Sequence, residues 1–132
     1  MDFIHLQSIV ISDYNNYKKI VTISKRENAD DSVKYFVDIR TYYQDVNDLR
    51  PTKAGVTLKS DELKDLLPHI PQGGGHQFDC NGRFISLTPS EKHNFFNFSI
   101  KKKDASTQLL LIHKYELDRI VYNKNKIFNC MK

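Results

Sequence analysis

The stretch that decides the fold is residues 35–70, YFVDIRTYYQDVNDLRPTKAGVTLKSDELKDLLPHI. It opens at 35–43 with a run of aromatic and β-branched residues, which is typical of a long strand. Because side chains alternate along a strand, the run divides between two faces. One face receives Phe36, Asp38, Arg40 and Tyr42, and the other receives Val37, Ile39 and Tyr43.

The rest of this stretch predicts a turn, an arm, a strand and a helix. An acidic turn at 45–48 leads through a hairpin arm at 49–53 to a strand at 55–58. A helix is expected to begin near Ser60, with Asp61 and Glu62 at its positive end. Its apolar face consists of Leu63, Leu66, Leu67 and Ile70. With a β-branched strand at 20–23 upstream, the order is four strands and a helix.

A proline- and glycine-rich segment, PHIPQGGG at 68–75, interrupts the chain near its middle. It predicts a first copy at 1–72, a glycine linker at 73–75 and a second copy at 76–132. The second copy repeats the order of the first. Residues 84–88 match 20–24 at an offset of 64, 98–101 match 37–40 at 61, and 112–121 match 58–67 at 54. An internal duplication is predicted; the alternative is that any two β-rich halves look alike.

Composition restricts the class of protein. The 132 residues fit one compact domain or two small halves, and no stretch approaches the 18 apolar residues of a membrane span. The N-terminus lacks the pattern of a signal peptide, and two cysteines, Cys80 and Cys130, are too few for a disulfide framework. These features predict an intracellular protein, nuclear or cytoplasmic, that binds no membrane.

Charge is distributed unevenly. Residues 1–72 carry 10 Lys/Arg and 11 Asp/Glu, whereas residues 73–132 carry 10 Lys/Arg and 5 Asp/Glu. A basic half attracts polyanions, although ordinary solvated lysines would give the same excess.

Residues 36–45, FVDIRTYYQD, and 49–58, LRPTKAGVTL, resemble the C-terminal domain of the transcriptional coactivator positive cofactor four. The resemblance covers residues 17–70. It implies a non-enzymatic protein that binds single-stranded DNA with little regard to sequence, in transcription or replication. Members of that family are homodimers of a strand-strand-strand-strand-helix unit. The resemblance therefore implies an α+β fold of two four-stranded antiparallel twisted sheets, each followed by a helix, packed as an intramolecular pseudo-dimer.

Four residues of the first copy match binding positions of the family. Arg40 matches a strand arginine, and Tyr43 stands where the family has a stacking tryptophan. Arg50 and Lys53 match basic residues on either side of the proline. The sequence departs from the family at Ala54 and Ser24, where basic residues are expected, and the second copy lacks the Pro-x-Lys-x-Gly arm.

An unpaired base stacks on an aromatic ring with about 1–3 kcal/mol, while Lys and Arg neutralise phosphates. The predicted nucleic-acid-binding residues combine both kinds of side chain. They are Lys25, Arg26, Lys34, Arg40, Tyr43, Arg50, Lys53, Arg83, Lys101, Lys102 and Lys103. The lysine run at 101–103 also fits a solvated hairpin end.

No catalytic set, phosphate loop or dinucleotide motif is present, so no enzyme and no cofactor are predicted. His76, Cys80, His93 and the distant Cys130 lack the tight spacing of a zinc site, and no metal is predicted. Two alternatives stay open: RNA binding by a similar sheet-helix repeat, and a degenerate copy that serves as a protein-interaction module. The predicted partners are single-stranded DNA or RNA and the transcription or replication machinery, with the chain a monomeric pseudo-dimer or a homodimer.

Overall fold

The computed structural model describes residues 3–72, 75–104 and 106–131 as two antiparallel sheets with helices. The elements of the first half are β1 (Ile4–Tyr14), β2 (Tyr17–Glu27), β3 (Val33–Gln44), β4 (Leu49–Lys59), α1 (Ser60–Leu66) and the 3-10 helix η1 (Leu67–Gln72). Those of the second half are β5 (His76–Cys80), β6 (Arg83–Pro89), β7 (Phe95–Lys101), β8 (Thr107–His113), α2 (Lys114–Tyr122) and α3 (Lys124–Asn129).

Each sheet has its four strands in sequence order, so the predicted α+β fold with two sheet-helix copies is confirmed. Of the predicted linker at 73–75, Gly73 and Gly74 lie outside the described residues. None of the helices in the described part of the chain has the length and apolar character that a membrane crossing requires.

The fourth strand of the first sheet differs from the prediction. The arm predicted at 49–53 and the strand predicted at 55–58 are one continuous strand, β4. The remaining strand of the sheet is β1 at the N-terminus, which the sequence did not predict. Two register shifts interrupt the pairing of β1 with β2, between His5 and Gln7 and between Val10 and Ser12. Each shift breaks the alternation of apolar and polar residues, which is why the sequence pattern did not reveal this strand.

The strand registers follow the predicted duplication. Ile20 lies opposite Arg40, and the residues at the predicted offsets, Phe84 and Lys101, also lie opposite each other. The last pair of strands differs, because Ile39 faces Val56 whereas Ile100 faces Gln108. This is a slip of two residues, which leaves every side chain on its original face.

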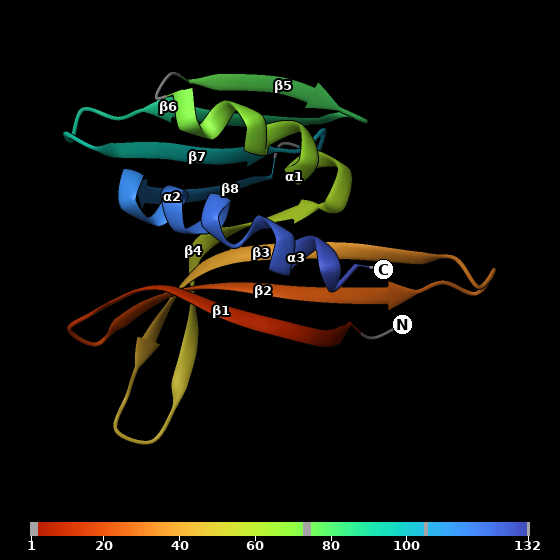
Figure 1. The fold of residues 1–132 in the computed structure, drawn as a ribbon, viewed down its shortest axis with the longest axis horizontal. Helices are drawn as coiled ribbons and strands as arrows, with labels where there is room; N and C mark the ends of the chain where they lie inside the picture. Colours follow the sequence, from red (N-terminus) through yellow and green to blue (C-terminus); the bar gives the residue numbers. More distant parts are fainter. Residues whose placement is uncertain (1–2, 73–74, 105, 132) are drawn as a thin grey trace.

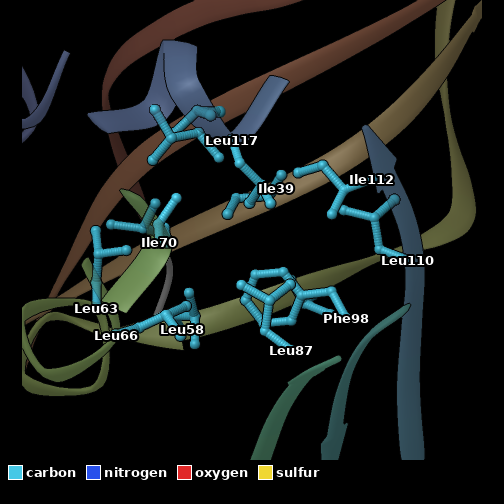
Figure 2. Close-up of a cluster of buried hydrophobic side chains, with 14 of the residues drawn as sticks. Ile39, Leu58, Leu63, Leu66, Ile70, Leu87, Phe98, Leu110, Ile112 and Leu117 are labelled. Carbon is cyan, nitrogen blue, oxygen red and sulfur yellow. The ribbon is translucent and has the colours of Figure 1, made fainter. Parts of the chain in front are cut away.

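Both halves contribute to a single apolar core. Figure 1 shows the sheets one above the other, with α1 in front of β6 and β7, α2 in front of β8, and α3 in front of the first sheet. In Figure 2, Ile39 and Leu58 from the first sheet meet Phe98 from the second and Leu117 from α2. The predicted apolar helix face, which continues from α1 into η1, is buried in this cluster.

Two ion pairs join the halves at equivalent places. Lys19 Nζ lies 2.7 Å from Glu116 Oε1 and donates to the Leu111 carbonyl oxygen at 3.1 Å. Arg83 Nε lies 2.9 Å from Glu62 Oε2, and Arg83 Nη2 donates to the Thr57 carbonyl oxygen at 2.6 Å. The basic residues are 64 positions apart and the acceptors 54, as in the predicted duplication. The chain therefore packs as an intramolecular pseudo-dimer.

Candidate nucleic-acid interface

One face of the first sheet packs into the core and the other faces away from it. Val37 and Ile39 of β3 are buried, whereas Phe36 and Arg40 alternate with them and lie on the opposite face. Cross-strand register adds residues of β2 and β4 to this outer face, and a ring contact with Phe36 adds Phe3, which precedes β1. Its basic and aromatic residues form what we call the outer-face patch: Phe3, Arg26, Lys34, Phe36, Arg40 and Lys59.

Arg40 is held flat against the sheet. Its Nε and Nη2 donate to the two Asp38 carboxylate oxygens at 3.1 and 3.0 Å, and its Nη1 donates to the Thr52 carbonyl oxygen at 2.9 Å. The Thr57 hydroxyl donates to the same carboxylate at 2.7 Å. A Cβ on Gly55 would lie 2.6 Å from Arg40 Cζ, so the glycine makes room for the guanidinium. Because Asp38 offsets the charge of Arg40, this arginine adds little net positive charge to the patch. Its main effect is to link β3 to Thr52 of β4 by hydrogen bonds.

At one end of the patch, an arginine lies between two phenylalanines. Arg26 Cζ is 5.8 Å from the ring centroids of both Phe3 and Phe36, and the rings meet edge to face at 5.1 Å. Arg26 Nε is buried and makes no hydrogen bond to any described residue. Phe3 is 56% exposed, and Lys34 lies opposite Arg26 on β3. The cluster therefore combines exposed aromatic surface with positive charge, the two features that single-stranded nucleic acids bind.

Tyr43 lies on the other face of β3, beyond the edge of the core. The hairpin of β3 and β4 projects away from the rest of the molecule (Figure 1). Tyr43 pairs with Tyr17 across the strands, and their ring centroids are 5.3 Å apart at 58°. Tyr43 is 37% exposed and Tyr14, next to Tyr17 in the ladder, is 76% exposed. We call Tyr14, Tyr17 and Tyr43 the tyrosine arm; the structure does not bring it onto the same face as Arg40.

The other predicted residues of the first half are spread over both faces. Lys25 lies on the face opposite the patch and pairs with Glu27 at 3.4 Å. Arg50 lies opposite Tyr43 and forms exposed pairs with Asp45 and Asp48 at 3.9 and 3.7 Å. Such exposed pairs contribute little stability, so Arg50 is available to a ligand. Lys53 is exposed where the ladder of β3 and β4 is irregular.

In the second half, the predicted basic residues separate into two groups. Arg83 forms an ion pair with Glu62 between the halves, and its side chain is largely buried there. Lys101 ends β7, and Lys102 and Lys103 lead into a turn that Asp104 closes by accepting from the Ser106 N–H and hydroxyl at 3.0 and 2.7 Å. These hydrogen bonds from Ser106 lower the pKa of Asp104 below its usual range. The lysine run therefore lies at a hairpin end, where it is accessible to phosphates.

The outer face of the second sheet carries two exposed leucines on β8. Leu109 and Leu111 alternate with the buried Leu110 and are 59% and 43% exposed. At the offset of 54, their counterparts in β4 are Gly55 and Thr57, which support Arg40 and Asp38. The two copies therefore present different surfaces.

Sequence reasoning did not identify Phe3, Phe36 or Lys59 as site residues. Alternation along β3 placed Phe36 on the face of Arg40, and this was a usable signal. Phe3 could not be found without its ring contact to Phe36, and Lys59 could not be found without the register of β4.

Together, a twisted sheet, a basic and aromatic face and a helix define a module suited to binding nucleic acid. The family model described as Transcriptional Coactivator p15 (PC4) matches residues 34–69, from β3 through η1. The predicted resemblance is therefore confirmed over that segment, to a family of DNA-binding coactivators that are not enzymes. The comparison with curated proteins gives no match.

Proposed function

We propose that this chain binds single-stranded DNA on the outer-face patch of its first sheet, without strong sequence preference, in support of transcription or replication. The observation that carries the proposal is the Phe3–Arg26–Phe36 cluster next to Lys34 and Lys59. Lys34, Phe36 and Lys59 lie within the segment that matches the coactivator family model, and Phe3 and Arg26 lie outside it. No catalytic role is proposed for any residue.

The binding mode follows from the chemistry of the patch. Exposed ring faces attract unpaired bases of any identity, because every base has a π-face. Lysines at the rim attract the phosphates between these bases, and they release counterions when the strand binds. The tyrosine arm offers a second stacking point at the other end of β3. Lys101, Lys102 and Lys103 offer a further contact for the backbone.

The test is a titration of the chain with labelled single-stranded DNA, duplex DNA and RNA of equal length at several salt concentrations. We expect the tightest binding to single-stranded DNA, with log affinity falling by roughly 0.7 per neutralised phosphate for each unit of log salt. A flat salt response, or equal affinity for duplex, would contradict the proposal. Tighter binding to RNA would assign the same patch to RNA.

A charge-matched pair of variants tests the location. Lys34→Glu with Lys59→Glu reverses two charges in the patch, and Lys124→Glu with Lys126→Glu reverses two exposed charges on α3. We expect the first variant to lose at least tenfold in affinity and the second to lose much less. Equal losses would show that only net charge matters and that the patch is not the site.

A role as a protein-interaction module is the second candidate, and Leu109 and Leu111 favour it. Exposed leucines side by side on one strand face are the kind of surface that a protein partner covers. Failure of all three oligonucleotides to bind the unaltered chain would favour this second function.

A further inference from the structure

We propose a divalent transition-metal site, with Zn²⁺ as its typical occupant, formed by Asp65, His69 and His76 at the junction of the two halves. One side-chain donor atom from each residue lies within 4.8 Å of the donor atoms of the other two. Asp65 is in α1 and His69 is one helical turn further on, in η1. His76 is the first residue of β5, so the cluster joins the last helical segment of one copy to the first strand of the other.

His76 carries the strongest evidence for a missing ligand. Its Nε2 is buried and makes no hydrogen bond to any described residue. Its ring is stacked on that of His69, with centroids 3.6 Å apart and planes at 11°, and it also lies 5.1 Å from the Phe78 ring. A buried imidazole nitrogen without a partner is costly, and a bound metal ion would remove that cost.

The donor set selects the class of metal. Two imidazoles and a carboxylate are ligands that Zn²⁺ and its first-row neighbours accept, whereas Mg²⁺ and Ca²⁺ prefer oxygen alone. Three protein ligands leave the fourth tetrahedral position of Zn²⁺ to water. No salt bridge among the described residues engages Asp65, His69 or His76, so their donors are not committed elsewhere.

Coordination requires a small local change. Donor atoms on one tetrahedral Zn²⁺ are roughly 3.3 Å apart, so the donors must approach one another by at most about 1.5 Å and the stacked rings must turn until their lone pairs converge. The Asp65 side chain is exposed and can rotate at little cost, and the His69 side chain is half-buried. At the offset of 54, Arg119 and Asn123 replace Asp65 and His69 in the second copy, so the site has no twin there.

The site differs from the grouping that the sequence suggested. His76 was considered there with Cys80, His93 and Cys130, and the spacing was judged too weak for zinc. In the described part of the chain, the group of potential ligands forms around His69 and Asp65 instead. Moreover, burial, with added repulsion from Asp61 and Glu62, raises the pKa of the Cys80 thiol, which disfavours the thiolate that zinc would need.

The experiment uses the tag-free chain, stripped of metal with EDTA and dialysed, then titrated with ZnCl₂ by calorimetry and by thermal melting. We expect one Zn²⁺ per chain and a rise in melting temperature of about 5–10 °C at saturating metal. His69→Ala and His76→Ala should each abolish the rise. His5→Ala, His93→Ala and the Cys80→Ser/Cys130→Ser double variant should keep it.

Each variant is compared with itself with and without metal, so a change in its basal stability cannot imitate loss of the site. No rise in the unaltered chain at millimolar Zn²⁺ would overturn the proposal. A rise that persists when His69 and His76 are both replaced would also overturn it. Neither measurement involves nucleic acid, so the outcome is independent of the proposed function.

Discussion

A single neighbour, the guanidinium of Arg40, explains why residue 55 is a glycine. A methyl group there would meet Arg40 Cζ at 2.6 Å, so Gly55→Ala should push Arg40 away from Asp38 and Thr52. We expect a loss of about 2 kcal/mol in unfolding free energy, measured by urea denaturation, because charged hydrogen bonds are broken.

The control is the same substitution in an Arg40→Ala background. The clash is then absent, and Gly55→Ala should be neutral or slightly stabilising because it restricts the unfolded chain. An equal loss in both backgrounds would show that Arg40 is not the reason for the glycine.

Tyr43 allows a test of base stacking away from the patch. Tyr43→Ala should weaken single-stranded DNA binding by about 1–3 kcal/mol with no change in salt slope, because no phosphate contact is lost. Tyr122→Ala, which removes an exposed tyrosine from α2, is the matched control and should bind normally. A Tyr43→Ala protein that melts much lower but binds normally when folded would exclude the stacking role.

For single residues, the sequence predicted which face of a strand a side chain occupies, but it did not predict the ion-pair partner of a charged side chain. Alternation alone placed Val37 and Ile39 on one face of the strand and Arg40 on the other, and in the structure the first of these faces is buried. It could not show that Arg40 would be held by Asp38, or that Arg83 would face Glu62 instead of solvent. A charged residue looks the same in sequence whether its partner is a phosphate or a buried carboxylate, because the partner is distant along the chain.

The third residue of both α1 and α2 is a glutamate that forms an ion pair with the opposite half. Glu62 is fully buried; its Oε1 accepts from the Lys59 N–H at 2.8 Å and its Oε2 pairs with Arg83. Glu62→Gln can keep the cap while it removes the charge. We expect a loss of about 3 kcal/mol in unfolding free energy, because a largely buried cation is left without its partner.

The control is a double-mutant cycle with Arg83→Met, measured by urea denaturation. Removing both charges should recover part of the loss, since no unpaired buried charge remains. Strict additivity of the two changes would contradict a direct coupling between the halves. Glu116→Gln tests the equivalent pair with Lys19, and we expect a loss in the same direction.

The identity of Glu62 and Glu116 at an offset of 54 was visible in the sequence, but its reason was not. Both carboxylates cap a helix N-terminus, which local pattern can suggest. Their second contact crosses between the halves, and only the folded structure supplies it. Elements with regular periodicity were therefore predictable, whereas β1, with its two register shifts, was not.

The whole molecule should unfold as one unit. A single core draws Leu58 from the first half and Phe98 from the second, so neither half can lose its packing alone (Figure 2). Leu58→Ala and Phe98→Ala should each lower the same melting transition, followed by circular dichroism and tyrosine fluorescence, at a cost of about 2–5 kcal/mol. Two separate transitions, each sensitive to only one substitution, would contradict the shared core.

The unequal outer faces of the two sheets have a consequence for the direction of a bound strand. A dimer of identical protomers has a twofold axis, and rotation about that axis exchanges the 5′ and 3′ ends of a strand lying across both faces. The two orientations are then equal in energy. Here one face carries Arg40 and its neighbours, and the other carries Leu109 and Leu111. A strand that crosses both faces is therefore expected to run one way only, which gives the complex a polarity without any base being read.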